Sequence, residues 1–532
     1  MQTIEANLVD LKQDKIYPVR LEYDKIIHSI TPINKQVEGY LLPGFVDAHV
    51  HIESSLLIPS EFARMAVLHG TVATISDPHE IANVLGIQGV QFMVENGKQT
   101  PFKFFFGAPS CVPATVFETA GDAINSDNIA KLLQQDDIYY LAEMMNFPGV
   151  LYDDEEVCKK IAHAHRLKKP IDGHAPGLVG EKLRKYFSAG ITTDHECFSL
   201  AEALEKLQLG MHVLIREGSA ARNFNELIPA IKAYPKQIMF CSDDKHPDSL
   251  LLGHINQLCA RAVKAGYNLF DVLRAACINP VKHYNVPVGQ LKIGDSADFI
   301  VAKDLSEFAI NKTVIAGEAV AQQGKSFIPS VNVTPINKFT LSALTPDDFA
   351  YQPQAIEPTI VCYDGQLITG KEMIEASNLL PENNVLKIVV VNRYKKQKIA
   401  AAYIKNFGLQ KGAIASSVAH DINNIVCVGV SDEAICNAVN LVIAHAGGLS
   451  AVSENEAHIL PLPVAGLMST DDAWKVAENY IALDKFSKVE LGSTLQAPFM
   501  SLSFMALLVI PSLKLSDKGL FDADSFKFLR EV

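Results

Sequence analysis

The sequence predicts an α/β protein: a (β/α)8 TIM-like barrel with a small flanking β domain and a C-terminal α/β domain. Two observations lead to this prediction. First, a short apolar strand, a polar strand end and a helix-compatible stretch alternate eight times after residue 40. Such alternation predicts a parallel sheet, and eight units over roughly 200 residues match the size of a barrel. Second, histidines and carboxylates recur at the predicted strand ends, where barrel enzymes carry their chemistry.

Each predicted element follows from this pattern. The barrel strands should end near His49, Asp77, Gly107, Glu143, His174, His195, Glu217 and Asp243. Intervening segments such as 59–69 and 200–209 have the apolar spacing of helices. Residues 1–40 alternate apolar and polar positions as short strands do, and a turn-rich strand pair at 289–301 could rejoin them.

These elements divide the chain into three predicted domains. We expect a small β domain of residues 1–40 plus 285–335 and the (β/α)8 barrel in residues 41–284. A C-terminal domain of residues 340–532 should contain strands at 386–391 and 425–430 and a helix at 432–444.

Composition excludes several classes of protein. The 532 residues are 48% hydrophobic and 20% charged, as in an ordinary globular protein. The net charge of −13, without a long basic run, argues against nucleic-acid binding. Nine scattered cysteines without a Cys-x-x-Cys pair predict reduced thiols in the cytoplasm and no thiolate zinc site. No signal peptide is recognisable, and the apolar run 499–510 is too short to span a membrane, so we expect a soluble chain.

His49 and His51 form the most informative pair. They close the apolar run that begins at Tyr40. On a strand, residues i and i+2 point to the same face, so both imidazoles can reach one metal ion. On a helix the same spacing would place them about 200° apart around the axis.

Further ligand-type residues follow at later strand ends. One buried histidine is more often a hydrogen-bonded core residue, but a set in register with the strand period favours a site. Four histidines, a glutamate and an aspartate exceed the needs of one tetrahedral ion and suit two ions of zinc, manganese or ferrous iron. Such a pair lowers the pKa of a bound water, and the aspartate of the eighth strand would then transfer its proton to the leaving group. The set is His49, His51, Glu143, His174, His195 and Asp243.

Other motifs carry less weight. His163 and His165 repeat the spacing but lie in a predicted helix, where their rings diverge. His51-Ile-Glu53 fits half of the zinc nucleobase-deaminase signature, but the Pro-Cys-x-x-Cys half is absent, so we reject that fold. The segment 216–222 offers charged and hydroxyl groups at the seventh strand end, for which substrate contact and a structural ion pair both remain open.

Longer motifs resemble the amidohydrolase superfamily and, within it, the adenine deaminases of bacteria. The resemblance covers nearly the whole chain. It rests on residues 43–55, the Ser-Ala-Asp298 turn, 77–86, 194–197, 216–222, 242–247, 461–468 and 498–504.

The resemblance implies hydrolysis of adenine to hypoxanthine and ammonia at a site with two manganese or iron ions. By motif, His49, His51 and Asp243 would bind one ion and His174 and His195 the other. Glu143 would bridge the two ions, and Asp243 would also shuttle the proton, which makes these two the catalytic carboxylates.

The remaining predictions concern neighbours of the site. Asp77 and His79 could order the site or bind an additional ion. Glu217, Ser219 and Asp244 are candidate substrate contacts. One departure from the family pattern is Asn423, which replaces a histidine in the run 419–425 and could alter efficiency or specificity.

Two other functions stay open. The chain could be a related amidohydrolase that acts on another amidine or cyclic amide, or a non-catalytic purine-binding scaffold. In each case we expect a small-molecule ligand, no nucleic acid, no membrane and a homo-oligomer.

Overall fold

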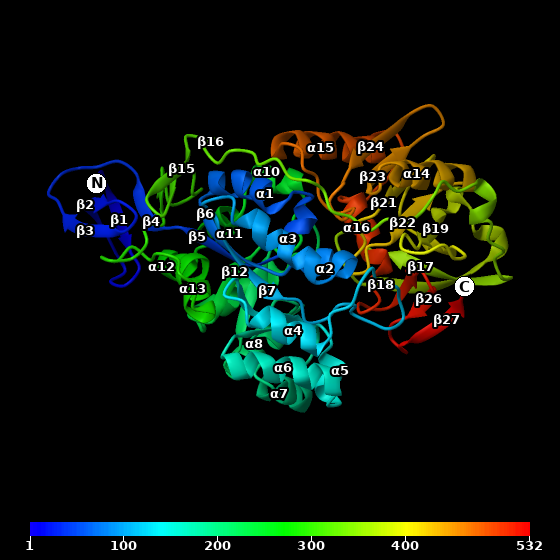
Figure 1. Ribbon diagram of the computed structural model, residues 1–532, viewed down its shortest axis with the longest axis horizontal. Coiled ribbons are helices and arrows are strands. Elements are labelled where there is room, and N and C mark those ends of the chain that lie inside the picture. The colour runs from blue at the N-terminus through cyan, green and yellow to red at the C-terminus, as the bar shows by residue number, and fades with distance from the viewer.

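Eight parallel strands form a closed barrel at the centre of the molecule (Figure 1). A computed structural model describes all 532 residues. Strands β5 to β9 pair in order, as do β10 to β12. The two arcs meet where Asp243 N donates to His49 O at 3.0 Å and where Thr192 N donates to Ile171 O at 3.2 Å. The predicted barrel is therefore confirmed.

The barrel strands end within two residues of the predicted positions. Seven of the eight are buried along their whole length or nearly so, as expected for strands covered on both faces. The strands are β5 (Phe45–Val50), β6 (Thr71–Ser76), β7 (Lys103–Ala108), β8 (Ile138–Met144), β9 (Ile171–Gly173), β10 (Thr193–Asp194), β11 (His212–Arg216) and β12 (Ile238–Cys241).

Helices surround the barrel, and polar caps fix where several of them begin. Asn125 accepts from Asn128 N in a capping box, and Asp154 and Ser199 cap two further helices. The helices are α1 (Pro59–Ala66), α2 (His79–Leu85), α3 (Ile87–Gly97), α4 (Ser126–Leu133), α5 (Phe147–Leu151), α6 (Glu155–Leu167), α7 (Gly180–Ser188), α8 (Leu200–Gln208), α9 (Phe224–Leu227), α10 (Pro247–Leu252), α11 (Ile255–Lys264), α12 (Leu269–Leu273) and α13 (Asn279–Tyr284).

Strands that precede the barrel in the sequence and strands that follow it form one sheet. Its order is β16-β15-β14-β13-β4-β1-β2-β3, and it lies at the left of Figure 1. The predicted strand pair at 289–301 was wrong in part, because only β13 forms there and it pairs with β4 and β14. The strands are β1 (Gln2–Asp10), β2 (Lys15–Tyr23), β3 (Ile27–Pro32), β4 (Tyr40–Pro43), β13 (Phe299–Ala302), β14 (Ile310–Ile315), β15 (Glu318–Gln322) and β16 (Lys325–Ser326).

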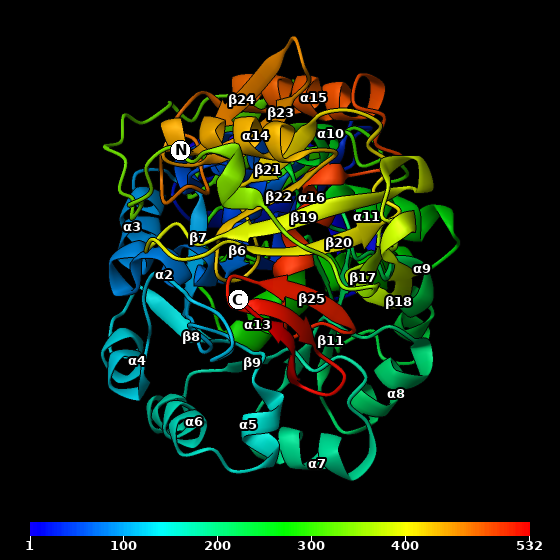
Figure 2. The ribbon, with the colours of Figure 1, turned by 90° about the vertical axis from the view of Figure 1, so that its right-hand side faces the viewer.

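The C-terminal part forms a second α/β unit on the opposite side of the barrel (Figures 1 and 2). Its large sheet has the order β18-β17-β20-β19-β22-β21-β23-β24, and β25-β26-β27 form a small one. The elements are β17 (Ile356–Cys362), β18 (Thr369–Glu375), β19 (Val385–Val391), β20 (Ala400–Lys405), β21 (Ala413–Ser416), β22 (Ile425–Gly429), α14 (Asp432–Ala444), β23 (Gly448–Val452), β24 (Ala457–Pro461), α15 (Ala473–Val489), α16 (Pro498–Ser503), β25 (Leu513–Ser516), β26 (Gly519–Asp522) and β27 (Lys527–Glu531).

The barrel and the C-terminal unit share one apolar core. A single buried cluster runs from Phe62 in α1 to Leu462 and Phe499 in the C-terminal unit. Ser469 N also donates to Leu56 O at 2.8 Å, and Arg64 pairs with Asp472 at 2.8 Å. A shared core fixes the C-terminal loops against the barrel.

No helix is long and apolar enough to cross a membrane.

Candidate metal centre and active site

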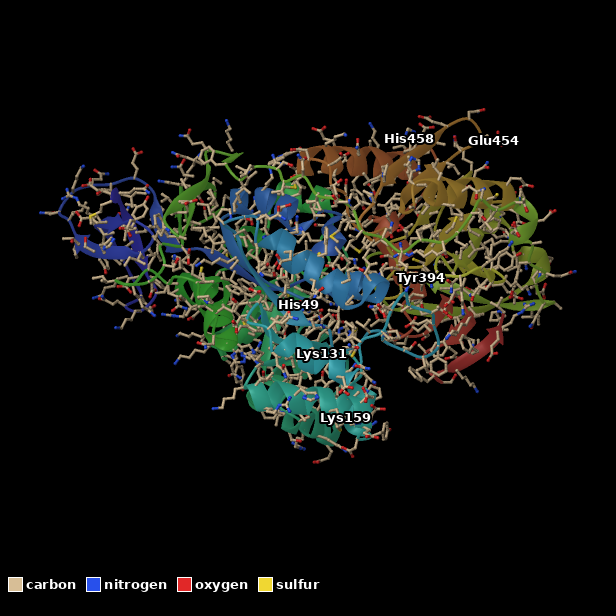
Figure 3. The ribbon with its side chains drawn as sticks, viewed as in Figure 1. His49, Lys131, Lys159, Tyr394, Glu454 and His458 are labelled. Atoms are coloured by element: carbon tan, nitrogen blue, oxygen red, sulfur yellow. The ribbon has the colours of Figure 1, made fainter.

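The six predicted ligand residues converge at the carboxyl ends of the barrel strands. They come from β5, β8 and the residues that follow β5, β9, β10 and β12. Figure 3 shows His49 in the interior, whereas Lys131 of α4 lies on the surface. The six side chains are at most about a tenth exposed: His49, His51, Glu143, His174, His195 and Asp243.

His49 and His51 direct their Nε2 atoms to one point. These two atoms lie 3.1 Å apart. Oδ1 of Asp243 lies 3.5 Å from the first and 3.3 Å from the second. The two imidazoles therefore lie on the same face, as their i, i+2 spacing at a strand end predicts.

Glu143 lies between the two groups of histidines. Its Oε2 is 2.6 Å from Nδ1 of His174 and 3.2 Å from Nε2 of His195. Its Oε1 is 3.3 Å from Nε2 of His51. Burial alone would raise the pKa of this carboxyl, but His174 and His195 hold that pKa well below its ordinary value.

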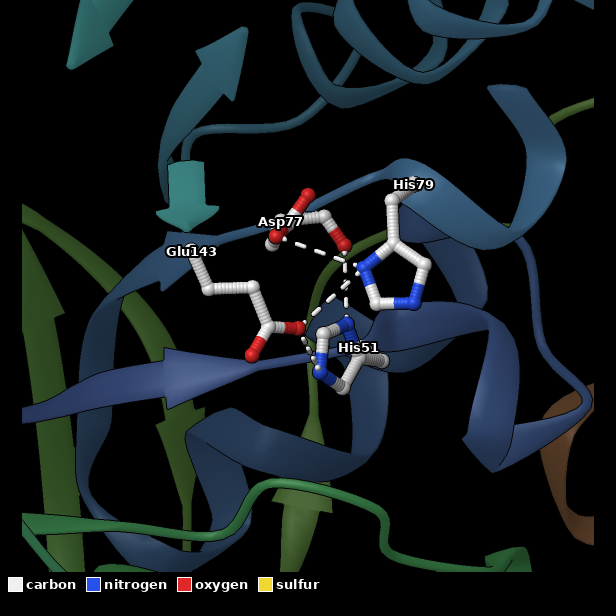
Figure 4. A group of neighbouring side chains, drawn as sticks. All are labelled: His51, Asp77, His79 and Glu143. Atoms are coloured by element: carbon white, nitrogen blue, oxygen red, sulfur yellow. Dashed lines mark hydrogen bonds and ion pairs between the residues drawn. The ribbon is translucent and has the colours of Figure 1, made fainter. Parts of the chain in front are cut away.

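Asp77 and His79 lie beside Glu143 (Figure 4). Nδ1 of His79 is 3.3 Å from Oδ2 of Asp77 and 3.3 Å from Oε1 of Glu143. The backbone carbonyl of Asp77 is 3.1 Å from Nδ1 of His51. Both residues therefore contact the ligand set, as a site-ordering role requires.

Arg216 and Glu196 fix the position of Asp243. Nη1 of Arg216 donates to Oδ2 of Asp243 at 2.7 Å, and the guanidinium also pairs with Glu196, with 3.1 Å between Nη2 and Oε2. Burial would raise the pKa of the Asp243 carboxyl, but Arg216 and the histidines hold it well below its ordinary value. Asp243 is therefore a carboxylate with Oδ1 directed at the histidines.

The C-terminal unit supplies one wall of the site. His420 and Asp421 lie in the loop between β21 and β22. Oδ1 of Asp421 is 3.2 Å from Nε2 of His79, and Nδ1 of His420 bonds to Glu80. The His420 ring stacks on Phe504 with 4.5 Å between centroids.

A narrow pocket lies between this wall and the ligand set. Its remaining lining from the C-terminal unit is apolar and comes from the loop after β17 and the segment after α16. These residues are Leu367, Phe504, Leu507, Val509 and Ile510. The pocket therefore has an apolar wall opposite a polar floor.

Of the three candidate substrate contacts, only Asp244 lines this pocket. Oδ1 of Asp244 accepts from Ser54 at 2.5 Å. Glu217 instead pairs with Arg261 at 2.5 Å, and Ser219 Oγ accepts from His246 N at 2.9 Å. The structure does not bring these two side chains to the site.

Sequence reasoning did not include several pocket residues. For Arg216 the sequence leaves substrate contact and an ion pair open, and the structure places it in ion pairs with Glu196 and Asp243. Sequence patterns do not indicate that His420, Asp421 and Phe504 line the pocket, because the packing of the C-terminal unit against the barrel brings them there. Asn423, the departure from the family pattern, donates to Oε2 of Glu80 at 2.6 Å and does not line the pocket.

The donor set fits divalent metal. Its atoms are imidazole nitrogens and carboxylate oxygens that lie within 4.8 Å of one another, in groups such as His49-His195-Asp243 and Glu143-His174-His195. Several of these atoms are buried without a hydrogen-bond partner, namely Nδ1 of His49, Nε2 of His174 and both carboxylate oxygens of Asp77. Such clustering is costly unless cations compensate it, so we identify a metal site here.

A parallel barrel with such a set at its carboxyl end defines a metal-dependent hydrolase. Residues 40–320 match the model of the amidohydrolase family, and residues 366–527 match that of the adenine deaminase C-terminal domain. The chain therefore belongs to the amidohydrolase family.

Relatives that match over nearly the full length narrow the family to which the chain belongs. It is 54% identical over 527 residues to the adenine deaminase of Sulfurovum sp. (strain NBC37-1), with 99% of each chain covered. It is 52% identical over 541 residues to that of Borreliella burgdorferi, again with 99% of each chain covered. Within the amidohydrolases, the chain is thus a member of the adenine deaminase family.

Proposed function

We propose that this chain hydrolyses adenine to hypoxanthine and ammonia at a centre of two divalent ions, manganese or iron, with zinc as a further option. The observation that carries the proposal is Glu143, whose two oxygens face both groups of histidines. A carboxylate in this position suits a bridge between two ions. His49, His51 and Asp243 would hold one ion, and His174 and His195 the other.

When bound, such ions lower the pKa of a water molecule and so supply a nucleophile near neutral pH. The protein residues control the proton. Asp243 has a carboxylate at neutral pH, with Oδ2 held by Arg216 and Oδ1 directed at His49 and His51. It would take the proton from the attacking water and pass it to the amino group that leaves from C6.

The pocket wall suits the purine. We place the ring against Phe504 and Leu507, with His420 and Asp421 at its edge. Oδ2 of Asp421 is buried without a partner, so it can accept an N–H of the imidazole ring of adenine. Because a buried carboxylate rejects an analogue that lacks this N–H, Asp421 would contribute to specificity.

Manganese-loaded protein and adenine provide the test. The proposal predicts release of ammonia and a change of the ultraviolet spectrum to that of hypoxanthine. Absence of turnover with manganese, iron and zinc would contradict it. Turnover of another amidine or cyclic amide, with adenine unchanged, would instead select a related amidohydrolase. Binding of adenine without turnover would select the scaffold.

A further inference from the structure

A second cavity lies at the opposite end of the barrel from the metal centre. Its volume is about 1160 Å³. Pro43 immediately precedes the segment that leads into β5, His212 begins β11, and Lys236 precedes β12. The lining therefore lies at the amino ends of barrel strands, and it shares no residue with the active-site pocket at their carboxyl ends.

Five cationic side chains line this basal cavity. They come from five separate segments: the β1–β2 turn, the loop before β12, the start of the π-helical turn after α12, helix α13 and the loop after Gln290. These residues are Lys12, Lys236, Arg274, Lys282 and Lys292.

Four of the five cations of the basal cavity have no carboxylate partner. Arg274 pairs with Asp14 and Asp271, but none of the four lysines forms an ion pair. The one carboxylate in the lining, Asp10, is already engaged. It accepts from Lys12 N at 2.9 Å, from Gln13 N at 3.0 Å and from the Tyr17 hydroxyl at 3.0 Å.

Convergence of four unpaired lysines is unexpected in a chain with a net charge of −13. The four side chains are exposed, and like charges around one concavity repel one another and make its potential positive. The arrangement therefore favours an anion with several charges, which would relieve the repulsion by binding.

The rest of the lining adds an apolar surface and ring nitrogens. Leu11, Ile30 and Ile293 contribute apolar surface, and Ile293 is 69% exposed. His212 and His283 also line the cavity, with 4.3 Å between ring centroids. Nδ1 of His212 is buried without a hydrogen-bond partner. A ligand with both an anionic and an aromatic part would use the whole lining.

We propose that the basal cavity binds a nucleoside polyphosphate. Its phosphates would contact the lysines, each phosphate group offering several acceptor oxygens. Its base and ribose would lie against Leu11, Ile30 and Ile293. This ligand class differs from the uncharged purine of the metal site, so the two sites are chemically distinct.

Calorimetric titration of the metal-loaded protein with adenosine triphosphate tests the proposal, with inorganic tripolyphosphate and adenosine as separate probes. One triphosphate should bind per chain, more tightly than tripolyphosphate, and more weakly as salt rises. In the Lys236→Gln/Lys282→Gln variant, affinity should fall at least about tenfold, with adenine turnover unchanged.

The matched control is Lys131→Gln/Lys395→Gln, which removes two exposed, unpaired lysines far from the cavity in sequence. It should bind the triphosphate as the unaltered chain does. Equal loss of affinity in both variants would overturn the proposal, because the effect would then be one of net charge. Absence of binding at millimolar triphosphate would also overturn it. If tripolyphosphate bound as tightly as adenosine triphosphate, the proposed contact with the nucleoside would be overturned.

Discussion

Nε2 of His79 lies 3.2 Å from Oδ1 of Asp421, although the two residues are 342 positions apart in the chain. His79 belongs to the barrel and contacts Glu143 through its other ring nitrogen. Asp421 belongs to the C-terminal unit and lines the pocket. The contact therefore links the wall of the pocket to the carboxylate at the centre of the ligand set.

Asp421→Asn tests the role of that wall. Asparagine keeps the shape of the side chain but removes the charge that faces His79 and the proposed N–H of adenine. We expect the KM for adenine to rise about tenfold with a smaller change in kcat, since binding of the ring is what the substitution weakens.

Steady-state kinetics and thermal unfolding should be compared with Asp471→Asn, which alters an exposed surface pair with Lys475. A parallel fall in kcat and in the unfolding midpoint, with KM unchanged, would show a purely structural role for Asp421.

Asp243→Asn tests the proposed proton transfer. Asp243 has a φ of 54°, a left-handed conformation that asparagine adopts readily, so the backbone should be retained. Turnover should fall by about 10²–10⁴, the usual contribution of a general base.

Metal content must be measured alongside turnover, because Asp243 is also a proposed ligand. The control Asp524→Asn changes an exposed turn and should leave both quantities unaltered. Retention of most activity by the metal-loaded Asp243→Asn protein would refute the assignment.

Local sequence patterns were sufficient to predict the barrel and the residues that converge at its carboxyl end. His49 and His51 share a strand face, and Glu143, His174 and His195 each lie at or directly after the end of a short barrel strand. These features depend on the alternation of side chains along a strand and on which end of a parallel barrel carries the site. Both features can be recognised from a few residues that are adjacent in the sequence.

The wall of the pocket could not be predicted in this way. His420 and Phe504 reach the site only because two units share a core, and no local pattern encodes that packing. The candidate contact Glu217 illustrates the same limit. It follows β11 as expected, but its pairing with Arg261 on α11 directs it away from the pocket.

Lys514 should make stability depend on pH. It is fully buried and donates to the carbonyls of Leu367 and Phe504 at 2.7 and 2.9 Å, and burial lowers its pKa to about 7. The unfolded chain has a lysine pKa of about 10.4 and so binds more protons between these two values. The free energy of unfolding should therefore rise with pH across this window, by up to about 1.4 kcal/mol per unit.

Lys514→Met removes this titration, so the stability of the unaltered chain relative to the variant should increase between pH 7 and 9. Urea unfolding at pH 7, 8 and 9 measures the difference. Lys527→Met, at an exposed position on β27, should show no such trend. A difference between the unaltered chain and Lys514→Met that is constant with pH would mean that Lys514 keeps an ordinary pKa in the folded protein.

Removal of metal should destabilise the folded chain. The cluster around Glu143 holds buried carboxylates and imidazoles whose free lone pairs have no partner, and bound cations would compensate them. An ion present at about 100 times its Kd stabilises the folded state by about 2.7 kcal/mol. Chelation should therefore lower the thermal midpoint by several degrees, and manganese should restore it.

Calcium should restore the midpoint poorly, because it prefers oxygen ligands and this set is rich in nitrogen. His174→Asn should show a smaller shift on chelation than the unaltered chain, since one proposed ligand is missing. His163→Asn, at a partly exposed position of α6 away from the ligand set, should behave like the unaltered chain. The same midpoint with and without chelator would mean that these residues balance their charges by hydrogen bonds alone, against the assignment of a metal centre.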